Sequence, residues 1–325
     1  MIDNNVFRGK MVKIYFLKFI YLLIHGKVIG KGRCKRMGTN NSILLNRVFT
    51  RNMIREILKD NFSDDYATAI RRYIVDPHDK DNGQLISEIY TVLKKEYRNE
   101  YYYKNTLLNK LLLGVHKPTT TAALTEITIG KSKADFVLIN GRAVVYEIKT
   151  ELDNLDRLES QIENYFKAFT RVSVLTCEDH FDVLQKRLDG SPVGICILTK
   201  KDTIREKKKP QEHFDKLNLD TMFRILRKQE YEEIIKKYFG ALPNVSQFEY
   251  YRTCKKMFCN MEKTIAYIAF IDILKKRGQI DVEMYSQIPY ELKFLVYFSD
   301  FKTNDYKRLN VFLHHKEAQI CTSLI

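Results

Sequence analysis

The sequence predicts an α/β fold, in which a mixed β-sheet is flanked by helices and is preceded and followed by helical regions. Apolar residues recur at helical spacing as far as residue 113, and after Gly114 and Pro118 they recur at the two-residue spacing of strands. Strand-like and helix-like segments then follow in the order βββαβαβ. This order is typical of helices packed against a mixed sheet.

The composition indicates a folded chain with a basic surface. Of its 325 residues, 45% are hydrophobic and 12% aromatic, and 55 Lys and Arg outnumber 40 Asp and Glu to give a formal net charge of +15. A surplus of this size attracts polyanions, so nucleic acid is the first partner to expect, and a basic but inert surface is the alternative. The six cysteines are scattered, which indicates a reducing, cytoplasmic location. No second pair stands at metal-ligand spacing, so a zinc site is not expected.

The chain before the sheet is expected to hold two segments. Residues 1–40 form a basic N-terminal extension, and residues 41–113 form a helical region with apolar stripes. The apolar run at 15–24 imitates a signal sequence, but Lys18 interrupts it and no small-residue cleavage site follows. Because the run is also too short to span a bilayer, no membrane segment is expected.

The predicted core covers residues 114–200. Strands are expected at 122–129, 134–139 and 143–149, and the pair Asn140-Gly141 predicts a tight hairpin between the last two. A helix from 153 to about 169, a strand at 172–177, a helix at 180–188 and a strand at 193–199 complete it.

Two further segments follow the core. Residues 201–210 are highly charged, and we interpret them as a basic linker or a loop that faces phosphate. Residues 211–325 are expected to be mainly helical and carry no readable motif. This C-terminal region is a candidate surface for a second copy of the chain or for another protein partner.

An acidic residue two positions before a lysine is a weak signal alone, because the chain contains five such triplets. They begin at Glu147, Glu206, Glu291, Asp300 and Asp305. Only Glu147 lies in an alternating strand, where the two-residue period sends Glu147 and Lys149 to the same face. The structural alternative for this pair is a simple salt bridge.

The hairpin places Asp135 on the strand beside Glu147. Two carboxylates and an ammonium are then within reach of one point, and carboxylate oxygens are the ligands that Mg²⁺ prefers. We therefore predict Asp135 and Glu147 as metal ligands for Mg²⁺ or Mn²⁺, with Lys149 as the catalytic cation. Glu126, on the preceding strand, is the candidate for a further ligand or a base.

The helix after Lys149 adds a second element. Asp153, Arg157, Gln161 and Tyr165 are spaced four apart, which would place them on one face of the helix. An Arg fork, an amide and a phenol suit a sugar–phosphate chain, so Gln161, Tyr165 and Arg157, together with Lys133, are the predicted substrate-binding residues. An ordinary amphipathic helix is the alternative.

Taken together, Glu126, Asp135, Glu147-Ile148-Lys149 and the Gln161-to-Tyr165 segment resemble the PD-(D/E)XK nuclease superfamily, in particular its RecB-like branch with a QxxxY motif. The resemblance covers about residues 114–200 and extends to a group of uncharacterised bacterial proteins. It implies a restriction-endonuclease-like core, Mg²⁺- or Mn²⁺-binding Asp and Glu residues and a catalytic Lys. The proline that precedes the first Asp in that signature is replaced by Ala134.

The resemblance implies a metal-dependent nuclease that hydrolyses phosphodiester bonds, with DNA as the favoured substrate and phage defence or foreign-DNA processing as the setting. A non-catalytic nucleic-acid-binding or regulatory protein on the same fold is the alternative. An acidic pair that repels phosphate when no metal is bound argues against pure binding.

Overall fold

The computed structural model describes residues 39–60, 62–115, 120–278 and 282–316. Nearly all of the predicted N-terminal extension, including the apolar run at 15–24, lies outside these ranges. No helix of the described part is both long enough and apolar enough to cross a bilayer. The four cysteines in these ranges, Cys177, Cys196, Cys254 and Cys259, are free thiols.

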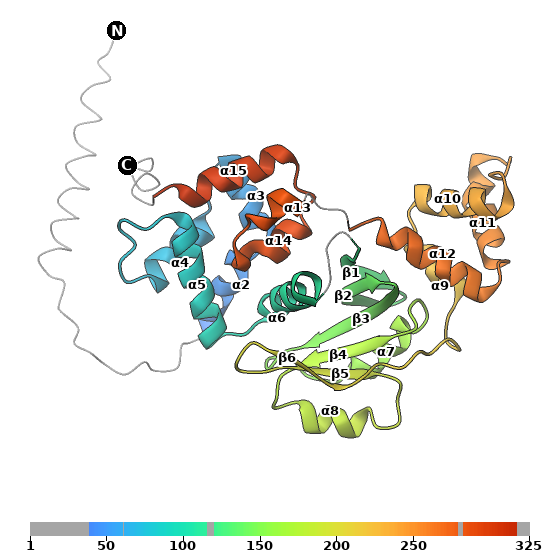
Figure 1. Ribbon diagram of the computed structural model, residues 1–325, viewed down its shortest axis with the longest axis horizontal. Helices are drawn as coiled ribbons and strands as arrows, with labels where there is room; N and C mark the ends of the chain where they lie inside the picture. Colours follow the sequence, from blue (N-terminus) through green and yellow to red (C-terminus); the bar gives the residue numbers. More distant parts are fainter. Residues whose placement is uncertain (1–38, 61, 116–119, 279–281, 317–325) are drawn as a thin grey trace, which may run out of the picture. The chain divides into compact units, whose positions relative to one another are not determined.

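A six-stranded mixed sheet organises the described chain (Figure 1), and its strands lie side by side in sequence order. The strands are β1 (Ala122–Ile129), β2 (Ser132–Asn140), β3 (Arg142–Lys149), β4 (Val172–Thr176), β5 (Gly194–Leu198) and β6 (Ile204–Lys208). The first three form an antiparallel meander, β3, β4 and β5 run parallel, and β6 returns antiparallel to β5. The predicted α/β class, with its flanking helices and helical end regions, is confirmed.

The hairpin between β2 and β3 forms where the sequence predicts it. Asn140 pairs with Arg142 across Gly141, whose φ of +68° is a conformation that glycine adopts without steric cost. This turn fixes the β2–β3 register, and the register decides which side chains of the two strands lie opposite each other.

The prediction that residues 201–210 form a linker or loop is wrong. Residues Ile204–Lys208 form β6, an edge strand in which Arg205, Glu206 and Lys207 are exposed. An edge strand needs little apolar burial, and charged side chains protect its unpaired backbone from other chains. The charge pattern was therefore compatible with a strand that apolar alternation does not reveal.

The helix expected from 153 to about 169 is also shorter than predicted. It runs as α7 from Leu158 to Tyr165. The Asp153 carboxylate accepts hydrogen bonds from the Thr150 backbone N–H at 2.8 Å and from the Thr150 hydroxyl at 2.7 Å, which holds the preceding segment in a turn. Asp153 therefore does not share a helix face with Gln161 and Tyr165.

One face of the sheet packs against helices from both ends of the chain. They are α2 (Thr39–Val48), α3 (Arg51–Asp60), α4 (Asp64–Tyr73), α5 (Asn82–Glu96), α6 (Glu100–Leu107), the π-helical η1 (Leu108–Val115), α13 (Val282–Ser286), the 3₁₀ turn η2 (Tyr290–Leu292), α14 (Lys293–Tyr297) and α15 (Thr303–His314). Phe136, Ile148 and Leu175 are among the sheet residues that enter this core.

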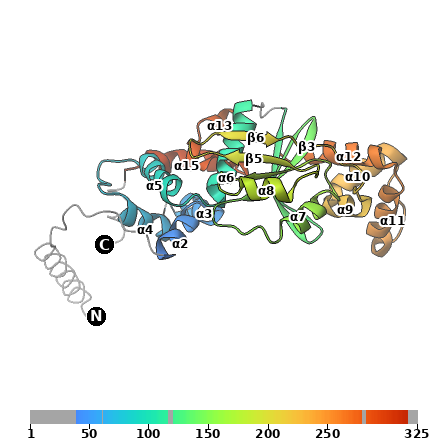
Figure 2. The same ribbon diagram turned by 90° about the horizontal axis from the view of Figure 1, so that it is seen from below.

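The other face packs against the helices from the middle of the chain. They are α7, α8 (Phe181–Arg187), α9 (Leu219–Ile225), α10 (Lys228–Phe239), α11 (Gln247–Cys259) and α12 (Lys263–Lys275). Val137, Val145 and Val174 enter this second core, and α8 covers β5 (Figure 2). The C-terminal region is thus helical as predicted, but its two halves belong to different faces of the sheet.

Candidate active site

Three carboxylates lie at the same level on three neighbouring strands. In the β1–β2 register, Glu126 and Asp135 lie between the pairs Thr125–Phe136 and Ile127–Ala134. In the β2–β3 register, Asp135 and Glu147 are the next residues beyond the pair Phe136–Tyr146. The hairpin therefore brings Asp135 beside Glu147, as the sequence predicts, and β1 adds Glu126 to the row.

The backbone of β1 is irregular at Glu126, where φ is +59°. Leu124, Ile127 and Ile129 all pack in the core on the α7 side, so the alternation of side chains shifts by one residue between Leu124 and Ile127. Glu126 consequently turns toward α6 on the opposite face. A non-glycine residue in the left-handed region costs about 1–3 kcal/mol, and such strain is concentrated at functional sites.

The side chain of Thr125 completes the local hydrogen bonding. Its hydroxyl donates to the backbone carbonyl oxygen of Asp135 at 2.7 Å. This bond supports the β1–β2 edge at the point where the left-handed Glu126 interrupts the regular pairing, and it fixes the two carboxylate-bearing residues relative to each other.

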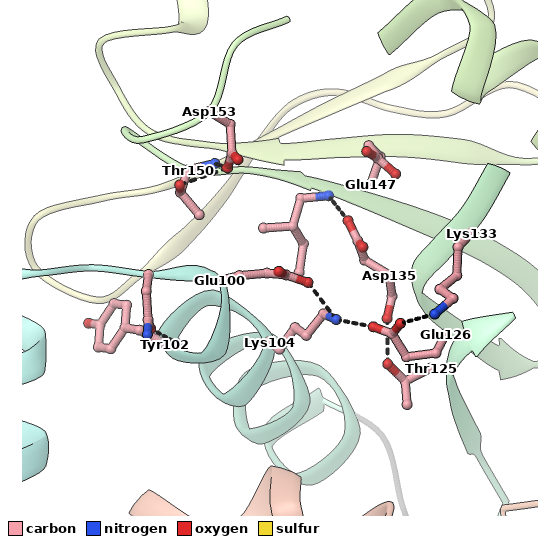
Figure 3. Close-up of polar contacts among 12 residues, drawn as sticks. Glu100, Tyr102, Lys104, Thr125, Glu126, Lys133, Asp135, Glu147, Thr150 and Asp153 are labelled. Carbon is pink, nitrogen blue, oxygen red and sulfur yellow. Dashed lines mark hydrogen bonds and ion pairs between the residues drawn. The ribbon is translucent and has the colours of Figure 1, made fainter. Parts of the chain in front are cut away.

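Helix α6 supplies two site residues that sequence reasoning missed (Figure 3). The Lys104 ammonium lies 2.5 Å from Glu126 Oε1 and 2.6 Å from Glu100 Oε1, while Lys133 Nζ lies 3.0 Å from Glu126 Oε2. Lys104 is buried, with 7% of its surface exposed. Burial lowers its pKa, but Glu100 and Asp135 outweigh that effect and raise it, so the ammonium stays charged.

Glu126 responds to the same cations. Burial acts to raise its pKa, yet the hydrogen bond and charge of Lys104, assisted by Lys133, hold the pKa of this carboxyl below its ordinary value. Glu126 is therefore an anion, bridged on its two oxygens by two ammonium groups.

Asp135 has the opposite tendency. Burial, followed by repulsion from the neighbouring Glu147 carboxylate, raises the pKa of Asp135 from 3.8 to about 8, although Lys104 and the Ile148 backbone act against the shift. The Ile148 N–H donates to Asp135 Oδ2 at 2.8 Å and so fixes the orientation of the carboxyl group. A cation bound between the two acids would remove the cause of this repulsion.

Glu147 and Lys149 form a buried ion pair on the face of β3 that carries α7. Lys149 Nζ lies 2.9 Å from Glu147 Oε1, and it donates to Gln161 Oε1 at 2.9 Å. Glu147 is 1% exposed and Lys149 9% exposed. The predicted common face of the two residues is thus present, and Gln161 holds the ammonium from the helix.

Tyr165 reaches Glu147 from α7. Its hydroxyl lies 2.5 Å from Glu147 Oε2 and 2.9 Å from the Lys133 carbonyl oxygen, so its single proton is shared between two acceptors. Burial and the Glu147 charge raise the pKa of this phenol, which keeps it a donor. The Gln-x-x-x-Tyr spacing therefore joins α7 to the strand pair at two points.

The remaining predicted substrate-binding residues lie at the surface. Lys133 is exposed and pairs with Glu126, and Arg157 is exposed immediately before α7 begins. Arg157 is therefore near the site in sequence but is not part of the helix face that carries Gln161 and Tyr165.

The acidic cluster has the chemistry of a hard-cation site. Ligand oxygens of Glu100, Glu126 and Asp135 all lie within 4.8 Å of one another. Oxygens bound to one Mg²⁺ at about 2.0–2.1 Å lie within about 4.2 Å of one another, so a small inward movement would complete three contacts. Glu147, predicted as a ligand, lies outside this trio and is engaged by Lys149 and Tyr165, while Lys104 provides the cation for Glu100 and Glu126.

Comparison with known proteins identifies one family. Residues 93–290, more than half of the chain, match the family model described as bacteriophage P4 protein cII. The matched segment contains α6, the whole sheet and α7, and hence every residue of the acidic cluster and of the Glu147–Lys149 pair. Neither the curated proteins nor the solved structures include a match to this chain.

Proposed function

The chain belongs to the bacteriophage P4 protein cII family, and we propose that its acidic cluster and the adjoining Lys149 form the active site of a metal-dependent nuclease that acts on DNA. The convergence of Glu100, Glu126 and Asp135, with the buried Glu147–Lys149 pair on the neighbouring strand, carries this proposal. Structural salt bridges do not require three carboxylates to converge, because like charges repel one another unless a cation joins them.

Mg²⁺ or Mn²⁺ is the cation that the oxygen donors favour. Glu126 and Asp135 would hold it, with Glu100 as a third donor from α6. When bound, such an ion polarises a phosphate and lowers the pKa of a coordinated water. Lys104, which neutralises Glu100 and Glu126 in this structure, would have to give up at least one of these contacts to the ion.

Lys149 is suited to stabilise charge that develops on the phosphate. Its ammonium is held by Glu147 on the same strand and by Gln161 on α7, so its position is fixed before substrate arrives. Tyr165 fixes Glu147 in turn. Exposed Lys133 would contact the phosphate backbone as a positioning charge.

The direct test measures cleavage by the purified chain. Plasmid, linear duplex, single-stranded DNA and RNA are each incubated with Mg²⁺ or Mn²⁺ and with EDTA. We expect metal-dependent cleavage that Asp135→Asn and Lys149→Ala abolish and that the exposed control Asp156→Asn retains. Equal cleavage by all four proteins would place the activity in a contaminant or at another site.

The alternative is a nucleic-acid-binding protein without catalysis, which the net charge of +15 favours. It predicts binding without cleavage on every substrate. Asp135→Asn would then bind nucleic acid at least as tightly as wild type, because the substitution removes a repelling charge.

A further inference from the structure

A cleft of about 290 Å³ lies beside the edge strand β1, apart from the acidic cluster. It is bounded by α3 on one side, by the segment from α14 to α15 on another, and by residues next to α10 and α12 on a third. We call it the β1 cleft and define it by Arg51, Thr125, Ile127, Arg227, Phe301 and Lys302.

The β1 cleft carries an excess of positive charge. Arg51 is the first residue of α3, and Arg227 and Lys302 immediately precede α10 and α15, where helix dipoles add to the positive potential. Among the described residues, Arg51 and Lys302 form no salt bridge, whereas the charge of Arg227 acts on the nearby Glu230 carboxylate and helps to lower its pKa. The three cations were not singled out by any sequence pattern.

Two other charged residues line the β1 cleft. Arg277 is neutralised, because its guanidinium donates to both oxygens of Glu230 at 2.6 Å. Asp300 is exposed and contributes one negative charge. Arg51 and Lys302, together with Arg227, whose charge is partly offset by Glu230, thus face the exposed anion Asp300, and the positive balance that remains suits a chain of phosphates.

The β1 cleft adjoins the proposed active site through the strand itself. Thr125 and Ile127 line it, and Glu126 lies between them. Because β1 is an edge strand, its outer side is not covered by another strand of the sheet. The Glu126 carboxylate does not line the cleft, because it turns toward Lys104 and Lys133, so a chain lying along this edge would pass the backbone of Glu126 before it reaches the acidic cluster.

We propose that the β1 cleft binds single-stranded nucleic acid and leads its backbone to the acidic cluster. The path of the nucleic acid from the cleft to the acidic cluster rests on the proposed nuclease function. Binding of the nucleic acid in the cleft does not require cleavage. The cleft volume of about 290 Å³ is close to the lower limit of about 300 Å³ for pockets that bind small ligands. It therefore has room for about one nucleotide and not for stacked base pairs. Half-buried Phe301, which packs against the core and edge-on to Tyr306, leaves part of its ring exposed for a base to stack on.

The experiment is a titration of a fluorescently labelled single-stranded oligodeoxynucleotide with the full chain in EDTA, followed by fluorescence anisotropy. We expect the triple variant Arg51→Ala/Arg227→Ala/Lys302→Ala to bind about tenfold more weakly or worse. Its plot of log affinity against log salt should be less steep by about 2, because each lost single-strand phosphate contact removes about 0.7. The variant Arg51→Lys/Arg227→Lys/Lys302→Arg keeps the charges and should restore binding.

A matched triple on the opposite edge of the sheet controls for net charge. Lys200→Ala/Lys201→Ala/Arg205→Ala removes three exposed cations at and before β6 and should leave affinity within about twofold of wild type. Equal losses in the two triples, or an unchanged affinity in the β1-cleft triple, would overturn the proposal.

Phe301→Ala tests the stacking contact and the choice of strand form. We expect it to weaken single-strand binding by about tenfold and duplex binding by much less. Equal weakening of both forms would mean that a duplex occupies the cleft and would reject the single-strand assignment. Binding at the cleft without cleavage would refute only the nuclease, whereas cleavage that is insensitive to the β1-cleft triple would refute only the cleft.

Discussion

Asp135→Asn should stabilise the metal-free protein. The Asp135 carboxyl is half-buried beside Glu147, and burial together with that neighbour raises its pKa from 3.8 to about 8. The folded chain therefore binds a proton at Asp135 more tightly than the unfolded chain does. The stability that this proton confers is fully present below about pH 4 and is lost as the pH rises through about 8. Asparagine is neutral throughout and retains an oxygen that can accept the Ile148 N–H.

The magnitude follows from the pKa difference. A rise of about 4 pKa units corresponds to an upper limit of about 6 kcal/mol above pH 8, at about 1.4 kcal/mol for each unit. Solvent reaches part of the side chain and screens the repulsion, so we expect a gain of about 2 kcal/mol in the free energy of unfolding. For a chain of this length, such a gain raises Tm by about 3 °C.

Thermal unfolding followed by circular dichroism tests this expectation in EDTA at about pH 5 and about pH 9, with exposed Asp156→Asn as the matched control. The gain should be large at the higher pH and small at the lower one. Mn²⁺ should then stabilise the wild type, by relieving the repulsion, and should stabilise the variant much less. A variant that is less stable than wild type at about pH 9, or a gain independent of pH, would refute the reasoning.

Three further predictions concern the cations and the phenol around the carboxylates. Lys149→Met should abolish cleavage and lower the free energy of unfolding in urea by about 3–5 kcal/mol, because Glu147 is left buried without its partner. Adding Glu147→Gln should recover most of this loss. A Lys149→Met protein as stable as wild type would contradict the prediction. Tyr165→Phe should cost about 1.5–3 kcal/mol in the same assay, since it removes a donor to a charged acceptor, and a cost near zero would mean that the hydroxyl bonds chiefly elsewhere. Lys104→Met should tighten Mn²⁺ binding by about tenfold in calorimetric titration, because it removes a competing cation beside Glu126; weaker binding would show that Lys104 organises the site instead.

The strand pair that carries Asp135 and Glu147 was predictable because every determinant is local. Alternating apolar residues define the two strands, and Asn140-Gly141 fixes the turn between them. Once the turn is set, register follows, because a slip of one residue would send the buried side chains to the wrong face. The number of residues between the turn and each acid then places Asp135 opposite Glu147.

Glu100 and Lys104 were not predictable in the same way. They lie on α6, which a helical pattern indicates, but nothing in that pattern specifies which face meets β1. The Lys104–Glu126 ion pair also depends on the left-handed backbone at Glu126, a conformation that glutamate rarely adopts. A tertiary contact that depends on an unusual local conformation leaves no periodic signal.

The cations of the β1 cleft could not be predicted from the sequence either, because they lie far apart along the chain. The three cations come from residues 51, 227 and 302, and each one alone is an ordinary charge at the beginning of a helix. They meet only because the two halves of the C-terminal region pack on opposite faces of the sheet, so that α10 and α15 approach β1 from different sides. Treating 211–325 as one region hid that division. Basic residues that are scattered along the sequence consequently form one localised surface at the edge of β1, which lies between those halves and contains Glu126.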